Sequence, residues 1–515
     1  MNTKFVTTHF VTFIVCSISL ILLFFLRDFL IYRDFSIIWH GSFLISEGYS
    51  PFRDFIMPIS PVSIYFSGFF IYLFGKSWLT FQLLQVFLNI VFLALIYLLL
   101  TRFKTSNPVI MSSLLLVTFF YLMLLSHPWY NNISALMLVA ILFMSFMNNK
   151  FFLFVGGLLS ALLLFTKLDF GLISIACSII ILIFKNNFRL NKKLIAQFSL
   201  FLFGIFLSIL FIVSLYSADV LIKTFAIYLE IFEDRSSRLL HLTQPKFLFM
   251  IFLSCWCIFY SLKYDKQLFL YGLILLAATA TSLLGGMEHT HWYYFFIIFP
   301  IISICYKEQK LRPHLIFIGP MLIFLIFPAL RYSTHVFENI LNDSYESEFF
   351  NYRNISTKTD IINLGHCSEY LRNVFGPRDF CEIKNIIYEN IVLEENYKHP
   401  LLNISELNFI GIELGLAPIK YHPLWYKVNQ TITPELQNSI ELDILQAKYK
   451  LVLVQQVPSA YSSNKKRSEM IFALSSNPLY EKLDKIYESP MCMIGNRSIE
   501  ECGIHIFKKK VSLKN

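Results

Sequence analysis

Two aspartates stand in the polar segment that follows the first apolar run of the chain. Asp34 comes directly after Arg33, and Asp54 comes directly after Arg53. A carboxylate can take a proton from an attacking hydroxyl group, and an arginine can hold an anion such as a phosphate. The simpler interpretation is an ion pair between each aspartate and its neighbouring arginine. The surrounding segment favours a catalytic role for Asp34, with Asp54 as a residue that replaces or assists it.

A lysine and an aspartate separate two apolar runs in the sequence Thr166-Lys167-Leu168-Asp169. Charges this deep in an apolar region are costly unless they face a cavity or each other. Lys167 is therefore a candidate residue for binding a lipid phosphate, with its ammonium group acting as a point charge. The alternative is an ordinary turn whose lysine reaches towards the membrane surface.

Two histidines precede a group of aromatic residues in segment 288–294. His289 and His291 are candidates for contacts with an anion or with hydroxyl groups, and Tyr293 is a further candidate for contact with a bound molecule. The histidines and Glu288 also suggest a metal site, but two histidines and one acid in a loop are weak evidence for a metal. The aromatic residues alternatively form a belt at the membrane surface.

Two arginines, Arg235 and Arg238, lie in the polar segment 217–246. They could bind a phosphate, or they could lie on a solvated, charged face of the protein. The segment 127–131 is a candidate lining for an acceptor groove. The sequence contains no Walker A, Rossmann glycine or metalloprotease motif.

The composition indicates a membrane protein. Of the 515 residues, 56% are hydrophobic and 15% are charged, and the mean hydropathy is +0.59. A soluble domain cannot bury so much apolar surface, and the charged fraction is well below the usual quarter. The net charge of +9 is explained by basic cytoplasmic loops, because no long basic run is present. Nucleic-acid binding is therefore not expected.

The basic residues predict the orientation of the apolar runs. If the N-terminus is cytoplasmic and the run 59–74 lies along the outer interface, thirteen Lys and Arg residues fall in the short cytoplasmic segments. We therefore expect about eleven membrane-spanning helices plus one interfacial helix in a multi-pass inner-membrane protein. The apolar runs are 8–26, 59–74, 78–100, 108–126, 133–148, 151–166, 170–184, 194–216, 247–262, 267–284, 292–305 and 314–330.

The polar tail, residues 332–515, is expected to be a periplasmic α/β domain. Residues 435–448 predict a helix and residues 450–454 a strand. Four cysteines fall in this tail, and in an oxidising compartment two disulfides are plausible. The simplest pairing joins neighbours, Cys367 with Cys381 and Cys492 with Cys502.

The first polar loop, 27–77, carries a family resemblance. Asp34 follows the first helix, a Glu47-Gly48-Tyr49 stretch leads to Arg53-Asp54, and prolines at 58 and 61 open an interfacial helix that ends in Phe74-Gly75-Lys76-Ser77. This pattern resembles the first loop of GT-C glycosyltransferases of the ArnT and protein-mannosyltransferase type. The resemblance implies a GT-C-like membrane domain over residues 1–331.

The resemblance also implies a function, the inverting transfer of one sugar from a polyprenyl-phosphate donor to a lipid, glycan or protein acceptor at the periplasmic face. Asp34, with Asp54, would act as base. The donor phosphate would be held by Lys167, Arg53, Arg235 and Arg238, and the remaining substrate contacts would come from Glu47, Asp169, His289, His291 and Tyr293. The family of this type usually works without a metal cofactor, whereas relatives that transfer oligosaccharides use a divalent cation.

The sequence leaves three alternative functions open. An O-antigen polymerase or ligase shares the lipid-linked substrate but should have a large arginine-rich loop between late helices. A transporter of polysaccharide or lipid should show paired broken helices in two related halves. A structural assembly protein with a decayed site would keep the architecture without the activity.

Overall fold

The protein is described by a computed structural model, which is mostly helical and contains a small sheet. The structure describes residues 3–25, 34–51, 53–57, 61–125, 128–147, 149–215, 244–285, 288–341, 361–372, 374–392, 401–405, 407, 409–420, 422–424, 434–456, 464–487 and 498–510. The chain forms two compact units. The first comprises Met1–Leu26, Ile59–Ser63 and Leu83–His335, and the second comprises Arg27–Pro58, Ile64–Gln82 and Val336–Asn515.

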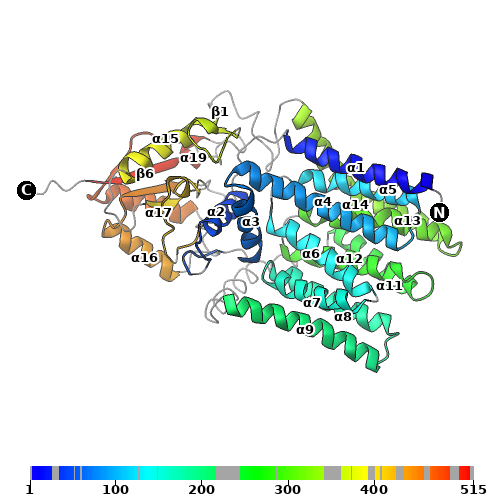
Figure 1. Cartoon of the computed structure of the whole chain (residues 1–515). Coiled ribbons are helices and arrows are strands. Elements are labelled where there is room, and N and C mark those ends of the chain that lie inside the picture. The colour runs from blue at the N-terminus through cyan, green and yellow to red at the C-terminus, as the bar shows by residue number, and fades with distance from the viewer. Residues whose placement is uncertain are drawn as a thin grey trace, which may run out of the picture. The chain divides into compact units, whose positions relative to one another are not determined.

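The first unit is built from apolar helices that lie side by side (Figure 1). Each apolar run found in the sequence coincides with helical structure. The helices of this part of the chain are α1 (Thr3–Phe25), α4 (Trp78–Arg102), α5 (Asn107–Phe120), η1 (Leu122–Leu124), α6 (Tyr130–Phe146), α7 (Lys150–Leu164), α8 (Leu168–Lys185), α9 (Lys192–Leu215), α11 (Pro245–Ser261), α12 (Gln267–Gly285), η3 (Glu288–Ile297), α13 (Ile298–Lys307), η4 (Arg312–His314) and α14 (Leu315–Leu341).

Four helices among the described residues are long and apolar enough to cross a membrane. They are Trp78–Arg102, Leu168–Lys185, Lys192–Ser214 and Gln267–Leu284. Several further helices are apolar but shorter, including Asn107–Phe120 and Tyr130–Phe146. The architecture is therefore that of a helical membrane protein, whereas the number of eleven crossings stays a prediction.

Glycines let two of these helices approach closely. A Cβ atom on Gly157 of α7 would lie 2.1 Å from the carbonyl oxygen of Phe201 on α9, and a Cβ on Gly204 of α9 would lie 2.3 Å from that of Phe154. Small residues at such crossings bring two backbones into van der Waals contact, which is the main source of helix association in lipid. The α7–α9 pair is thus held by reciprocal glycine contacts.

The basic segments between the helices meet at one end of the first unit. Gln267 donates a hydrogen bond to the carbonyl oxygen of Phe103, 3.2 Å away, and the Phe103 and Tyr271 rings pack at 6.2 Å. Lys185 donates to the carbonyl oxygens of Ser145 and Met147. Segments 101–107, 148–151, 185–193 and 263–267, all predicted to be cytoplasmic, therefore have neighbours in one another.

The second unit contains a four-stranded sheet in the order β3-β4-β6-β5. Its strands are β3 (Leu401–Ile404), β4 (Leu451–Gln455), β5 (Tyr480–Lys482) and β6 (Ile504–Lys509). Strands β3 and β4 are parallel, and the other two pairs are antiparallel. A separate antiparallel pair joins β1 (Ile361–Asn363) to β2 (Phe375–Pro377). The helical elements are η5 (Leu364–His366), α15 (Arg378–Ile387), η6 (Tyr388–Val392), η7 (Ile412–Leu414), α16 (Pro434–Leu445), α17 (Asn464–Ser476) and α19 (Ile499–Cys502).

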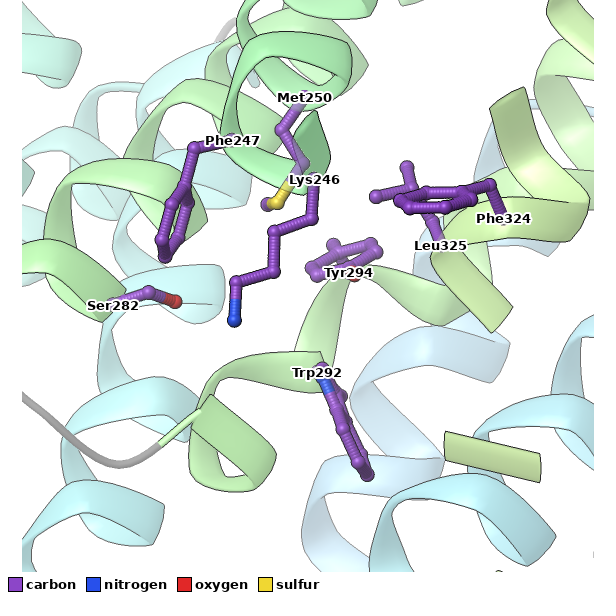
Figure 2. A pocket seen from close by; sticks show the side chains of 8 residues that line it. All are labelled: Lys246, Phe247, Met250, Ser282, Trp292, Tyr294, Phe324 and Leu325. Carbon is purple, nitrogen blue, oxygen red and sulfur yellow. The ribbon is translucent and has the colours of Figure 1, made fainter. Parts of the chain in front are cut away.

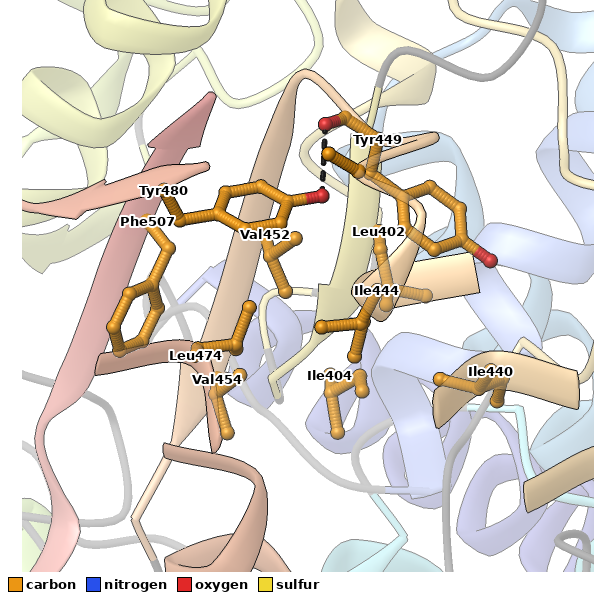
Figure 3. Close-up of a cluster of buried hydrophobic side chains, with 11 residues drawn as sticks. Leu402, Ile404, Ile440, Ile444, Tyr449, Val452, Val454, Leu474, Tyr480 and Phe507 are labelled. Atoms are coloured by element: carbon orange, nitrogen blue, oxygen red, sulfur yellow. Dashed lines mark hydrogen bonds between the residues drawn. The ribbon is translucent and has the colours of Figure 1, made fainter. Parts of the chain in front are cut away.

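An apolar cluster between the sheet and its helices forms the core of this domain. Val452 and Val454 of β4 and Ile440 and Ile444 of α16 belong to it, as Figure 3 shows. The hydroxyl group of Tyr480 donates a 3.0 Å hydrogen bond to a backbone carbonyl at the edge of the cluster. The helix predicted at 435–448 and the strand predicted at 450–454 are both present in the structure.

Most of the first polar loop belongs to the second unit, together with the tail, whereas Ile59–Ser63 belong to the first unit. The loop contains two helices. The sequence did not predict α2 (Asp34–Ser46), whereas α3 (Pro61–Phe74) coincides with the apolar run 59–74, whose position along the outer interface stays a prediction. Ile56 and the segment 422–424 exchange backbone hydrogen bonds. The amide of Trp78 donates to the carbonyl oxygen of Tyr370, 2.8 Å away. The first unit ends at His335, four residues after the predicted domain boundary at 331. The two divisions differ at the first polar loop: the predicted domains assign it to the membrane helices, whereas the compact units group most of it with the tail.

Cys367 and Cys381 form a disulfide, as the sequence pattern suggested. Cys502 is also disulfide-bonded, and its expected partner, residue 492, lies outside the described residues. Lys384 of α15 donates a 2.6 Å hydrogen bond to the carbonyl oxygen of Cys367 and lies 3.0 Å from the carboxylate of Glu413. The disulfide and this buried ion pair together fix the β1–β2 region of the tail.

Candidate functional site

A buried ion pair lies at the start of α8. The Nζ atom of Lys167 is 3.5 Å from Oδ2 of Asp169, and the two side chains are only 6% and 9% exposed. Lys167 is the N-cap residue of α8 in extended backbone conformation, so α7 ends and α8 begins on either side of it. Both charges are therefore removed from water within a bundle of apolar helices.

Aromatic rings surround the lysine. Its Nζ atom lies 4.7 Å from the ring centroid of Phe170 and 5.7 Å from that of Tyr130. These distances are within the range of cation–π attraction, which is stronger away from water. The Phe170 ring in turn lies 6.4 Å from the ring of Tyr293, which is completely buried. Three residues singled out in the sequence, Lys167, Asp169 and Tyr293, are thus brought into one cluster.

Tyr293 is held from the other side by α12. Its hydroxyl group and Oγ1 of Thr281 are 3.2 Å apart. Through this tyrosine, η3 contacts both α8 and α12. The position of the Phe170 ring therefore depends on a segment more than a hundred residues away in the sequence. The sequence singles out Tyr293 as a candidate but gives no indication of its partner Thr281.

A polar network crosses the apolar interior near the same helices. Nε2 of Gln85 donates a 2.6 Å hydrogen bond to Oδ1 of Asn89, and Nδ2 of Asn89 donates to the carbonyl oxygen of Leu122 at 3.1 Å. Asn132, two residues after Tyr130, reaches Gln85 at 3.5 Å. This network was not predicted from the sequence. The signal was present, because Gln85 and Asn89 are four residues apart and so share one face of an otherwise apolar helix.

The Lys167 cluster contains one buried positive charge and one buried negative charge. Oδ2 of Asp169 has no hydrogen-bond partner among the described residues, so the aspartate compensates the ammonium charge at 3.5 Å without a hydrogen bond to that oxygen. Ionisable groups inside a membrane bundle are costly and usually mark a substrate or ion pathway. A phosphate oxygen would form a charge-assisted hydrogen bond with the ammonium group, which is stronger than the present ion pair.

The candidates in the first loop belong to the second unit. The guanidinium group of Arg53 donates to Asp54, with Nη2 2.8 Å from Oδ2, and the amide of Ser50 donates to the same oxygen at 2.7 Å. The Arg53 hydrogen bond, aided by the Ser50 amide, lowers the pKa of the Asp54 carboxyl despite its partial burial. A carboxylate held in this way is a weaker base. Asp54 is therefore a turn-forming partner of Arg53, and its role as a base stays a prediction.

Two further candidates lie in the loop, and the side chain of only one of them is described. Glu47 forms an ion pair with Lys76, which joins the end of α2 to the end of α3. Asp34 is the first residue of α2, and its side chain lies outside the described part of the structure. The helix itself is firmly packed, because the Trp39 ring lies 5.6 Å from the ring of Trp78.

The remaining candidates are not described by the structure at the level of their side chains. Arg235 and Arg238 lie outside the described residues. His289 and His291 belong to η3, but only their backbone is described. Within the described residues, no group of three or more His, Cys, Asp or Glu side chains lies close enough together to hold a metal ion.

Comparison with known proteins identified no relative of the chain. The chain matches no model of a known protein family, and none of the curated proteins matches it significantly. The candidate site therefore rests on the Lys167 cluster and its geometry.

Proposed function

We propose that the protein is a membrane-embedded glycosyltransferase of the GT-C type, which moves one sugar from a polyprenyl-phosphate donor to a lipid, glycan or protein acceptor. The observation that carries the proposal is the buried Lys167 at the start of α8, compensated by Asp169 at 3.5 Å and enclosed by aromatic rings. A cation of this kind is suited to the phosphate of a lipid-linked sugar, because negative charge builds up on the phosphate as its bond to the sugar breaks.

The proposed reaction is a single displacement. The hydroxyl oxygen of the acceptor attacks the anomeric carbon of the sugar, and the bond from that carbon to the phosphate oxygen breaks. The polyprenyl phosphate leaves with the electron pair of that bond, and Lys167 stabilises its negative charge. The proton of the attacking hydroxyl passes to a carboxylate, which the loop resemblance assigns to Asp34. One displacement inverts the configuration at the anomeric carbon.

The proposed setting is the outer face of a bacterial inner membrane, with about eleven crossings, one interfacial helix and a periplasmic tail. Two observations support this orientation. The basic segments meet at one end of the first unit, where cytoplasmic loops belong. Lys167 lies at the opposite end of α8 from Lys185, which belongs to that basic end.

Mass spectrometry of envelope glycans from a deletion strain tests the proposal. We expect one sugar or decoration to be missing, and a plasmid-borne wild-type copy to restore it. Lys167→Met should fail to restore it, whereas Lys192→Met, which removes an exposed lysine from α9, should succeed. A deletion strain with an unchanged glycan profile, measured while the wild type expresses the protein, would contradict glycosyl transfer.

A further inference from the structure

Arg312 of η4 is held in place against the end of α13. Its Nε atom donates a 2.8 Å hydrogen bond to the carbonyl oxygen of Tyr306, and its guanidinium carbon lies 4.6 Å from the centroid of the Tyr306 ring. That distance is within the range of cation–π attraction. Among the residues that the structure describes, the Nη1 and Nη2 atoms of Arg312 have no hydrogen bond or ion pair. The edge of the guanidinium group that these two atoms form is therefore open to a ligand.

An open guanidinium edge fits a phosphate group. Its two amino groups can donate two parallel hydrogen bonds to two phosphate oxygens, and hydrogen bonds between charged partners are stronger than neutral ones. The Arg312 side chain is exposed, so a ligand can reach it. Because Tyr306 already fixes that side chain, binding a phosphate costs little conformational entropy.

Further cations lie at the same end of the first unit. The hydroxyl group of Tyr260 on α11 lies 3.4 Å from Nε2 of His314, which brings the segment after α11 next to η4. The exposed lysines of segments 262–268 and 306–314 are Lys263, Lys266, Lys307 and Lys310. These segments contain two acids, Asp265 and Glu308, and the Asp265 carboxylate already accepts a hydrogen bond from the backbone at the start of α12. The surface around Arg312 therefore attracts anions.

Large apolar side chains begin next to this basic surface. On α14, Ile316 and Phe317 stand about one turn after Arg312 and are 72% and 67% exposed. At the end of α11, Phe259 and Leu262 are 68% and 63% exposed. In a membrane helix such exposed side chains face lipid tails. A molecule that fits both features has an anionic head group and apolar tails.

The helices α11 and α14 also meet further from the basic surface. Met250 of α11 and Leu325 of α14 line one small cavity, as Figure 2 shows. Close to these two residues in the sequence, Phe252 of α11 and Phe327 of α14 are exposed. The two helices therefore offer a lipid tail an apolar surface that continues away from its head group.

We propose that this basic surface binds one anionic phospholipid of the bilayer. Arg312 holds the lipid phosphate through Nη1 and Nη2, the neighbouring lysines strengthen the attraction, and the tails lie along the exposed side chains of α11 and α14. The basic end is the predicted cytoplasmic end, and the membrane surface on that side is negatively charged. The inference is separate from the Lys167 cluster and does not require that the protein transfers sugar.

Native mass spectrometry of the full-length protein in detergent tests the proposal. The probes are anionic phosphatidylglycerol, zwitterionic phosphatidylethanolamine and polyprenyl phosphate. Arg312→Gln should weaken phosphatidylglycerol binding by about tenfold, as expected when one charge-assisted contact is lost. Phosphatidylethanolamine binding should change less, because the lysines repel the ammonium group of that lipid. Equal losses for the two phospholipids would overturn the proposal, and a loss confined to polyprenyl phosphate would overturn the choice of a phospholipid.

The matched control is Arg189→Gln, which removes an exposed arginine from another basic segment at the same end of the first unit. This variant should leave phosphatidylglycerol binding unchanged. If the basic residues only fixed the orientation of the helices, the two variants would behave alike, and that result would overturn the proposal.

Tyr306→Leu tests whether the ring positions the arginine. The variant keeps every charge but removes the ring contact, and it should weaken phosphatidylglycerol binding less than Arg312→Gln does. The double variant should bind no more weakly than Arg312→Gln alone, because Tyr306 acts through Arg312, and additive losses would overturn that positioning role. Should Arg312→Gln fail to fold, a photoactivatable phosphatidylglycerol on the wild type decides: crosslinks at 306–317 support the site, and their absence overturns it.

Discussion

Lys167 and Asp169 face each other across 3.5 Å with almost no exposure to solvent, at the junction between α7 and α8. A buried pair of this kind adds little net stability, because the cost of removing two charges from water offsets their attraction. Loss of one partner, in contrast, leaves an uncompensated charge in the bundle. Net stability therefore does not account for this pair, and we propose that Lys167 binds a phosphate.

Lys167→Met alone should destabilise the protein by about 3–5 kcal/mol, because it leaves the Asp169 carboxylate buried without a cation. The double variant Lys167→Met, Asp169→Asn removes both charges and should recover most of that loss. Thermal unfolding of the full-length protein in detergent measures both. A double variant as unstable as the single one would show that the charge of Asp169 is not what Lys167 compensates.

Gly157→Ala should destabilise the α7–α9 pair by about 1–3 kcal/mol, because the added Cβ has only 2.1 Å to the carbonyl oxygen of Phe201 and a backbone must shift. The neighbouring residue supplies the control. A Cβ on Gly156 would meet its nearest atom at 3.7 Å, an ordinary contact. Gly156→Ala should therefore leave the unfolding temperature unchanged or slightly raised, and equal destabilisation by the two alanines would contradict the close glycine contact.

The disulfide of Cys367 and Cys381 should be oxidised in living cells, because the tail is proposed to lie outside the cytoplasm. Thiol labelling of intact cells, before and after reduction, measures this. Replacement of both cysteines by serine should cost about 3 kcal/mol, the value expected for a loop of this size. Free thiols at both positions in freshly lysed cells would contradict the extracytoplasmic location.

The stability of the tail should depend on pH through His505. Burial on β6, and to a smaller extent the nearby Lys482 charge, lowers the pKa of its imidazole from 6.5 to about 4. The unfolded chain therefore binds more protons than the folded one between these values, so the stabilising contribution is complete above pH 6.5 and is lost as the pH falls towards 4.

His505→Gln should remove this part of the pH dependence. The measurement is the unfolding temperature of the full-length protein across the same pH range, for wild type and variant side by side. The difference between them should be constant above pH 6.5 and should narrow or reverse towards pH 4. Parallel curves over the whole range would mean that His505 does not titrate differently in the two states.

Much of the helical framework could be predicted from the sequence, because a long apolar run in a membrane protein has few alternatives to a helix. The helix at 435–448 and the strand at 450–454 were also predictable from local pattern. By contrast, α2 was missed. Its thirteen residues are flanked by polar segments, and its burial comes from Trp78 and Tyr370, the second of which is more than three hundred residues away.

The candidate site was predictable in its parts but not in its arrangement. The cost of burying Lys167 and Asp169 could be inferred from the sequence alone, since both stand between apolar runs. The contact between the Phe170 and Tyr293 rings depends on the packing of η3, which no local sequence pattern predicts.

Release of polyprenyl phosphate tests the central claim most directly, because this co-product is the same whichever sugar is transferred. Lipids extracted from the deletion strain, which should accumulate the unused donor, would be incubated with the purified protein and membrane acceptors, and free polyprenyl phosphate measured by mass spectrometry. A transporter would leave the sugar–phosphate bond intact and release none.

We predict that the wild type releases polyprenyl phosphate and that the stable double variant Lys167→Met, Asp169→Asn does so about a hundredfold more slowly, as expected when one preorganised electrostatic contact to the leaving group is lost. Lys192→Met should match the wild type. Equal release by the wild type and the double variant would contradict the role of Lys167, and no release by the wild type would contradict glycosyl transfer itself.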